Sequence, residues 1–198
     1  SVRSALSVDR HEGVLVFSGR MSESRSYGLV LLPGEPARGD FIGFARSLAL
    51  GDVLMRLGVD APPHVTVLHF RTDAETADRV FRSLAVEAPQ PVAVTAMGLV
   101  WAVIPEGDFY VPEGGVYAGI DVRCTPTLRS LHDLSVGLAG RFGCEVISAS
   151  GERFNPHVSL AVLRERPVRG FEIPRGLASG AFPARLALGV MGPYGTFP

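Results

Sequence analysis

The sequence predicts a mixed fold of strands and helices that is built from a duplicated strand-helix-strand unit. The spacing of the hydrophobic residues changes along the chain between the alternation that is typical of strands and the period that is typical of amphipathic helices. The last strand of each unit carries closely related residues, Pro-His-Val-Thr-Val and Pro-His-Val-Ser-Leu. We interpret this self-similarity as an internal duplication. The repeated strand, helix and strand cover residues 27–32, 41–57 and 64–70, and then 116–123, 127–142 and 157–163.

Each element of the first half has its own local signal. Residues 14–17 and 27–32 are short β-rich runs separated by a polar loop, which predicts a pair of strands. From Asp40 the apolar spacing becomes helical and continues to residue 57, where Gly58 ends the helix. Residues 62–70 form a β-branched run that predicts a strand. Thr72 and Glu75 then have the spacing of a capping box and predict the start of a second helix.

The second half repeats this alternation. Residues 92–104 predict one or two strands, and the Pro-, Gly- and Glu-rich stretch 105–115 that follows predicts a loop. Pro126 marks the start of a helix whose apolar stripe ends before Gly143. Strands are expected over 116–123, 154–163 and 184–191, and residues 1–26 are expected to be an N-terminal extension that carries the 14–17 strand.

Composition excludes several classes of protein. The chain has 198 residues, 19 basic and 20 acidic, and every basic residue is an arginine. A net charge of −1 argues against a protein that follows long nucleic-acid duplexes, although a few arginines suffice for a small anionic ligand or a nucleic-acid end. Cys124 and Cys144 are too few for a disulfide framework. No stretch resembles a signal peptide or a membrane span, so we expect a soluble, cytoplasmic protein without a membrane partner.

The two repeated strands carry the residues with the clearest chemical meaning. Side chains alternate along a strand, so His64 and Thr66 share one face, and His157 and Ser159 share the equivalent face 93 residues later. Displacement at phosphorus needs a base for the attacking oxygen and an acid for the leaving oxygen, and histidine can do either near neutral pH. Hydroxyl groups can donate hydrogen bonds to phosphate oxygens. The pattern favours phosphate chemistry that requires no metal or other cofactor.

The paired motifs His64-Val65-Thr66-Val67 and His157-Val158-Ser159-Leu160 resemble those of the two-histidine phosphoesterase superfamily, which includes 2′,5′ RNA ligase-like proteins and cyclic phosphodiesterases. The resemblance covers about residues 27–191. It implies a bilobed α+β fold with two antiparallel sheets around a central cleft, in a single domain over 27–198. The implied lobes are 27–104 and 116–198, and strands can be exchanged between them.

The same resemblance implies roles for the motif residues. His64 and His157 are expected to be the acid-base pair, with Thr66 and Ser159 binding phosphate oxygens. Ligase-like members often carry an arginine where this chain has Val162, and Arg164 lies two residues further on. Members act on 2′,3′-cyclic phosphates or related phosphodiesters without a metal. The implied partner is a small nucleotide or an RNA end with a cyclic phosphate.

Other residues are weaker candidates. Aromatic side chains can stack on a nucleobase, although most belong to a core, as we expect of Tyr110. His69 lies at an odd offset of five from His64, so a regular strand would turn it to the opposite face, as a packed or surface residue. The candidate substrate-binding residues are Phe154, Tyr194, Arg164 and Tyr27.

The predicted function is therefore a metal-independent phosphodiesterase that hydrolyses 2′,3′-cyclic phosphates of nucleotides or RNA ends, with water as the nucleophile. One alternative is the joining of RNA ends through a 2′,5′ linkage at the same site. A second is a nucleotide- or RNA-binding module without catalysis. The absence of serine-hydrolase, nucleotide-triphosphatase, Rossmann and zinc-protease motifs removes support for those classes.

Overall fold

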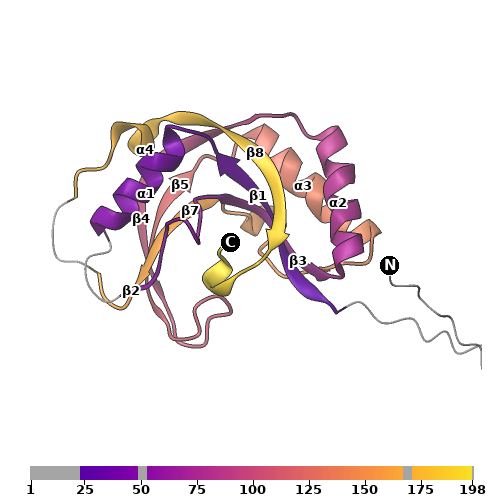
Figure 1. Cartoon of the computed structure of the whole chain (residues 1–198), viewed down its shortest axis with the longest axis horizontal. Coiled ribbons are helices and arrows are strands. Elements are labelled where there is room, and N and C mark those ends of the chain that lie inside the picture. The colour runs from indigo at the N-terminus through magenta and orange to yellow at the C-terminus, as the bar shows by residue number, and fades with distance from the viewer. Residues whose placement is uncertain (1–22, 49–52, 167–170, 198) are drawn as a thin grey trace, which may run out of the picture.

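The computed structural model describes residues 23–48, 53–166 and 171–197, so the strand expected at 14–17 lies outside the described residues. Within these described ranges, strands and short helical turns alternate with four α-helices (Figure 1). In chain order, the elements are β1 (Arg25–Pro33), α1 (Ala37–Leu48), β2 (Val53–Arg56), β3 (Val65–Thr72), α2 (Ala74–Glu87), β4 (Val92–Ile104), β5 (Gly115–Val122), α3 (Pro126–Arg141), β6 (Glu145–Val146), η1 (Gly151–Arg153), β7 (His157–Leu163), α4 (Arg175–Ser179), β8 (Ala181–Val190) and η2 (Pro193–Gly195).

The eight strands are joined by antiparallel pairing in the order β2-β7-β5-β4-β8-β1-β3-β6, and β3 also pairs with β7. The predicted α+β class is confirmed. Hydrogen bonds connect the strands into one sheet rather than the two expected, because β4 pairs with β8 from Val92 to Thr95. The extra pairing of β3 with β7 closes six of these strands into a ring.

The pairing pattern repeats in the two halves of the chain. β1 pairs with β3 and β8, and β5 pairs in the same way with β7 and β4. The short strand β6 lies beside β3, just as the short strand β2 lies beside β7. The predicted duplication is thus visible in the sheet. Because β2 pairs with a strand of the second half and β8 with a strand of the first, elements cross between the halves, while the lobe boundaries themselves stay a prediction.

The helices lie in two pairs, with α2 against α3 and α1 against α4 (Figure 1). The three predicted helices α1, α2 and α3 each bury residues of the apolar face that their spacing predicts, and on α1 this face includes Phe41, Phe44 and Leu48. The ring of Phe41 meets the ring of Phe182 on β8 edge to face, with centroids 5.3 Å apart. Burying a side chain of this size contributes about 1.5–3 kcal/mol. None of the described helices is long and apolar enough to cross a membrane.

Three local expectations were wrong. The helix predicted over 41–57 ends at Leu48, and Val53–Arg56 is the strand β2. Pairing with β7 gives its backbone the partners that a helix would have supplied, a tertiary effect that periodicity does not report. The cap of α2 is Asp73, which accepts a hydrogen bond from the Thr76 backbone, instead of Thr72. The short elements β6 and α4 were not predicted.

Candidate active site

The two histidine strands meet at one point of the sheet. β3 and β7 are paired only through Val65 and Val158, both of which are fully buried in the core. In an antiparallel pair the residues flanking this contact lie across from one another, so the register sets His64 beside Ser159 and Thr66 beside His157. Both motifs are therefore brought to a common face of the sheet, opposite the two valines.

Each motif histidine is held by the same local hydrogen bond. Nδ1 of His64 lies 3.0 Å from the carbonyl oxygen of Pro62, and Nδ1 of His157 lies 2.9 Å from that of Asn155. A carbonyl can only accept, so Nδ1 carries the proton in both rings. In the neutral imidazole Nε2 then keeps its lone pair. Backbone carbonyls orient both rings and leave Nε2 of His157 for acid-base chemistry, while the carbonyl of Gly195 also faces the His64 ring.

Burial lowers the pKa of both histidines below the ordinary value of 6.5. The carbonyls of Pro62 and Asn155 act in the opposite direction, because they stabilise the protonated rings. The neighbouring positive charge of His157 adds to the lowering for His64, whereas Asp121 raises the pKa of His157. Near neutral pH both rings are thus mainly neutral in the free protein.

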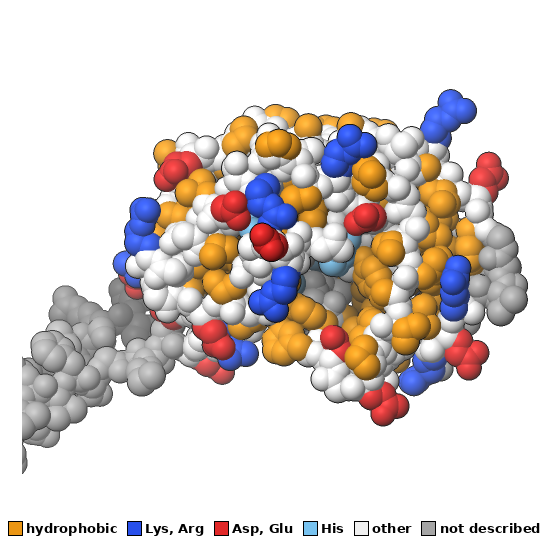
Figure 2. All heavy atoms as spheres, turned by 180° about the vertical axis from the view of Figure 1, so that it is seen from behind, with side chains coloured by type: hydrophobic (Ala, Val, Ile, Leu, Met, Phe, Trp, Pro, Cys, Tyr) orange, Lys and Arg blue, Asp and Glu red, His pale blue; other side chains and the backbone are white. Residues whose placement is uncertain are grey.

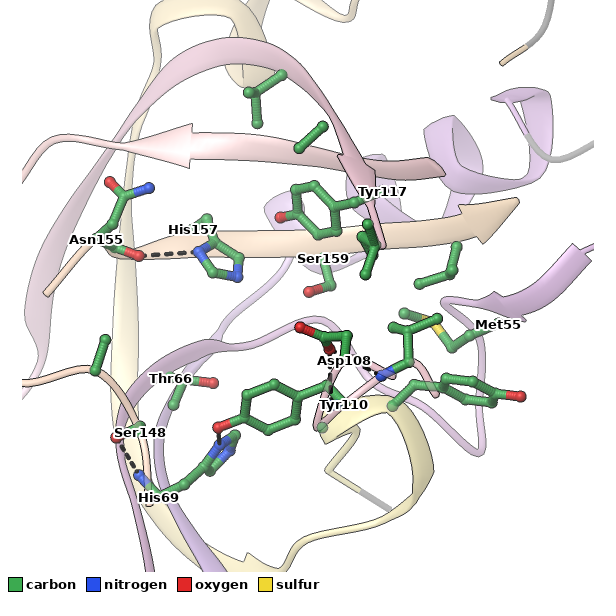
Figure 3. Close-up of a pocket in the computed structure, with 18 of the residues that line it drawn as sticks. Met55, Thr66, His69, Asp108, Tyr110, Tyr117, Ser148, Asn155, His157 and Ser159 are labelled. Carbon is green, nitrogen blue, oxygen red and sulfur yellow. Dashed lines mark hydrogen bonds between the residues drawn. The ribbon is translucent and has the colours of Figure 1, made fainter. Parts of the chain in front are cut away.

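A cavity of about 420 Å³ opens beside the second motif and takes in residues from both (Figure 3). Such a volume is within the range of small-molecule sites. Part of its wall is apolar, with Met55, Ile104 and Val111 among the lining residues. Histidine side chains are visible at a hollow of the surface beside a broad area of hydrophobic side chains (Figure 2). The polar residues of the lining include both members of the second motif and Thr66 of the first, and they are Thr66, His69, Asp108, Tyr110, Tyr117, Ser148, Asn155, His157, Ser159 and Tyr194.

The two motif histidines differ in access. His157 lines the cavity, but His64 is only 6% exposed and lies beneath the C-terminal turn η2. The backbone carbonyl of Gly195 faces the His64 ring and raises its pKa, although burial outweighs this effect. The ring of Phe197 lies against the other side, with centroids 6.0 Å apart. In this arrangement the C-terminal turn separates His64 from the cavity.

His69 lies in the cavity, contrary to its expected position on the opposite face. A β-bulge explains the error. The register of β1 with β3 pairs Leu29 with Leu68 but Val30 with Thr66, so Val67 is an extra residue and the alternation of faces shifts after it. An equivalent bulge follows the second motif, where Ala118 pairs with Ala161 and Gly119 with Ser159. Position five after each histidine, His69 or Val162, therefore faces the cavity.

His69 is held in its neutral form by its surroundings. Burial, followed by the charges of His64 and His157, lowers its pKa to about 4. Burial, followed by Asp108, raises the pKa of Tyr110 to about 12. The Tyr110 hydroxyl therefore donates to Nδ1 of His69, 2.9 Å away. This pair is a neutral, buried hydrogen-bonded unit at one end of the cavity, so Tyr110 lines the site and is not the core residue that we expected.

The other sequence candidates are divided between the cavity and the rest of the fold. Phe154 lines the cavity and stacks on the buried ring of His132, with centroids 3.9 Å apart. Tyr194 also lines it, and its hydroxyl lies 3.2 Å from a carboxylate oxygen of Glu113, to which it donates. Tyr27 does not line it: this residue is buried in the core against Phe70. Arg164 follows the end of β7 and is outside the lining.

The charge of the cavity is low. Within the part of the chain that the structure describes, Asp108 supplies the only carboxylate of the lining, and no arginine belongs to it. Oδ1 of Asp108 accepts hydrogen bonds from the backbone of Tyr110 and Val111, which fixes the loop. Among the same described residues, no three His, Cys, Asp or Glu side chains converge as ligands of a metal ion. Any phosphate bound here would be held largely by neutral donors.

Comparison with known proteins identifies the fold. No protein-family model and no curated protein matches the sequence. Among solved structures, the chain is similar in fold to phosphoesterase-type proteins, in agreement with the resemblance of its two motifs. It is similar in particular to LigT of E. coli. The LigT complex with ATP has a TM-score of 0.56 at 15% identity and covers 86% of this chain and 89% of LigT.

Two further structures have similar values. LigT in complex with 3′-AMP has a TM-score of 0.53 at 15% identity, covering 86% of this chain and 90% of LigT. A protein described as a phosphoesterase has a TM-score of 0.53 at 14% identity, with the same coverage of 86% and 90%. At these identities the comparison establishes the fold, and the chemistry has to be argued from the site.

Proposed function

We propose that this protein is a phosphoesterase that hydrolyses 2′,3′-cyclic phosphates of nucleotides or RNA ends, with His64 and His157 as the acid-base pair. One observation carries the proposal: both histidines are tied by Nδ1 to the carbonyl two residues earlier, on strands that meet at a single residue pair. This places two oriented imidazoles and two hydroxyls, Thr66 and Ser159, around one point, and catalysis by His64 then requires the turn η2 to move away from its ring.

The proposed reaction uses each group once. One imidazole accepts a proton from water through Nε2 as the water oxygen bonds to phosphorus. The bond from phosphorus to the 2′ or 3′ ribose oxygen breaks, and the other imidazole, protonated at the start, gives its proton to that oxygen. The hydroxyls of Thr66 and Ser159 donate hydrogen bonds to the non-bridging oxygens as charge develops on them. The products are a phosphomonoester and a free ribose hydroxyl.

The chemistry bound by similar proteins supports this class of substrate. LigT has been crystallised with 3′-AMP, with ATP and with phosphate. A cavity of about 420 Å³ with a partly apolar wall suits one nucleoside. Joining of RNA ends uses the same acid-base pair, but it must hold a second phosphate-rich strand. The lack of arginine in the described lining favours hydrolysis of a small substrate over that alternative.

The test is a turnover assay on 2′,3′-cyclic nucleotides and on oligoribonucleotides that end in a cyclic phosphate. We expect wild-type turnover that survives dialysis against EDTA, because protons and charge are handled by side chains. His64→Ala and His157→Ala should each reduce kcat/KM by about 10²-fold or more. Circular dichroism checks that the variants fold.

Three outcomes would contradict the proposal. The wild-type protein could turn over none of these substrates, or a correctly folded single variant could keep near-normal turnover. Activity that is lost on chelation and restored by Mn²⁺ or Zn²⁺ would contradict its metal-independent form. The ratio of 2′- to 3′-phosphate product then assigns which ribose oxygen leaves.

A further inference from the structure

Tyr117 and Gly119 on β5 form a compact structure beside the second motif. β5 pairs with β7 so that Gly119 lies across from Ser159 and Tyr117 across from Val162. The phenol of Tyr117 folds back over Gly119: a Cβ atom added to Gly119 would lie 1.8 Å from the phenol oxygen. Only glycine leaves room for this side-chain position. β5 thus carries a large residue, Tyr117, and the smallest residue, Gly119, two positions apart on the face that borders the cavity.

The phenol oxygen of Tyr117 is buried, and among the described residues the Ser159 hydroxyl faces it as a donor, which leaves the proton of the phenol without an acceptor. Buried hydroxyl groups in native proteins nearly always use their hydrogen-bonding capacity, so this unused proton calls for a ligand or a water. The ring stands edge-on to His157, with centroids 5.4 Å apart and planes at 77°. In Figure 3 the hydroxyl of Tyr117 points along the cavity toward His157, above Ser159.

The first motif has no equivalent group. In the duplicated arrangement the position of Tyr117 corresponds to Gly28, because Gly28 pairs with His69 as Tyr117 pairs with Val162. The ring of His69 occupies the space above Gly28. The phenol nearest to that motif, Tyr110, already donates to His69. Among the described cavity residues, a fully buried side-chain hydroxyl whose proton has no acceptor is therefore found on the His157 side alone.

We propose that the Tyr117 hydroxyl donates a hydrogen bond to a non-bridging phosphate oxygen of the substrate, next to the oxygen bound by Ser159. This role rests on the proposed phosphoesterase function and adds a catalytic residue to the two motifs. It answers a need of this cavity, whose described lining holds no arginine to balance the charge of the phosphate. Neutral donors must then stabilise the charge that develops during attack.

The protonation state of Tyr117 suits a donor. Burial raises the pKa of Tyr117 well above the ordinary value of 10.0, and the negative charge of Asp121 raises it further. The hydrogen bond from the Ser159 hydroxyl lowers this pKa and offsets part of the rise. The phenol consequently keeps its proton across the working range of the two histidines. It supplies a hydrogen bond and takes no part in the transfer of protons.

Tyr117→Phe removes the oxygen and keeps the ring, so it is the sharpest test. On 2′,3′-cyclic AMP we expect kcat/KM to fall by about 10-fold to 10²-fold, mainly through kcat, on the scale of one lost transition-state donor. The two limbs of the pH profile should stay in place, because the phenol does not titrate there. A variant that merely loosened the packing around His157 would move those limbs. Tyr27→Phe, which removes a phenol oxygen from the core outside the cavity, is the matched control and should leave kcat/KM unchanged.

The position of the phenol is tested by Gly119→Ala. The added methyl group collides with the Tyr117 ring, so kcat/KM should fall at least as far as in Tyr117→Phe. In a Tyr117→Ala background the same change should have little further effect, since the collision is gone. Thermal unfolding of all variants shows whether a loss of activity follows a loss of fold.

Failure of this inference and failure of the proposed function give different results. If the wild-type protein hydrolyses cyclic phosphates and folded Tyr117→Phe keeps kcat/KM within about two-fold of it, the role of Tyr117 is overturned. If the wild-type protein has no turnover, binding of inorganic phosphate, measured by calorimetry, decides. Weaker binding in Tyr117→Phe than in Tyr27→Phe supports the donor, and equal binding overturns it.

Discussion

At the scale of single residues, the surroundings of His64 and His157 determine the pH at which each ring is protonated. Both rings are neutral in the free protein near pH 7, because burial lowers the pKa of each below 6.5. The proposed reaction requires one neutral and one protonated imidazole at the same time. The two pKa values that govern such a pair belong to the pair and not to either residue. Burial therefore has a direct effect on the pH at which the enzyme works.

We predict a bell-shaped dependence of kcat/KM on pH, with its optimum on the acid side of 6.5. As pH falls from neutral, activity rises when the first ring gains its proton, and it falls again when the second does. Bound phosphate is an anion and raises both pKa values, so the optimum of kcat should lie at higher pH than that of kcat/KM. Initial rates over the pH range on 2′,3′-cyclic AMP measure both. An optimum of kcat/KM on the alkaline side of 6.5, or a flat profile, would rule out this assignment.

At the scale of elements, the β-bulge after each motif determines which side chains reach the cavity. The bulged residue Val67 leaves its carbonyl outside the regular ladder, and Nδ1 of the buried His132 on α3 lies 2.8 Å from it. His132 therefore satisfies a backbone group that the bulge would otherwise leave without a donor. His132 on α3 thus supports the strand that carries the first motif.

The same bulge marks the limit of prediction from sequence. The elements and the pairing of motifs followed from periodicity and repetition, which are local properties of the chain. His69 was misplaced because its face depends on the register of β3 against β1, a non-local property. Tyr110 and Asp108 come from the loop before β5. A loop has no regular alternation of side chains, so the sequence does not predict which way these two residues point. Arg164 and Tyr27 were suggested by residue type, and only packing shows that neither borders the cavity.

The C-terminal turn η2 makes a separate prediction about access. Gly195 and Phe197 cover His64, whereas His157 borders the cavity. Diethyl pyrocarbonate acylates accessible neutral imidazoles, so His157 should react several-fold faster than His64 when sites are read by mass spectrometry. Deleting residues 193–198 should bring the rate of His64 close to that of His157. Fully buried His132 is the internal control and should stay unreactive in both proteins. Equal rates at His64 and His157 in the intact protein would show that the turn does not cover the first motif.

At the scale of the whole molecule, three histidines with lowered pKa values make stability depend on pH. The pKa values of His64, His69 and His157 are all lowered on folding. Below the unfolded value of 6.5 the unfolded chain binds more protons than the folded one, so stability is full above that pH and is lost as pH falls. For His69, with a folded pKa of about 4, the loss is complete near pH 4 and amounts to about 3 kcal/mol.

Urea unfolding at a series of pH values between 7 and 4 tests this prediction. The midpoint should fall steadily across that window, and His69→Phe should flatten the dependence because one of the three groups is removed. The control is His69→Phe at pH 7, which reports the packing cost of the substitution without the proton linkage. An unchanged slope in His69→Phe would mean that His69 titrates normally in the folded state.

The position of β8 has a consequence for how the molecule folds. β8 is the last strand of the chain, yet it lies between β1, the first described strand, and β4. Without β8, the strands β1, β3 and β6 would be joined to the strands β2, β7, β5 and β4 only through the pair of Val65 with Val158. Pairing of the first strand with the last also closes a very long loop, which slows folding. During synthesis β1 and β4 therefore each keep one edge without a partner until residues 181–190 have left the ribosome. At those two edges the nascent chain is most exposed to pairing with another copy.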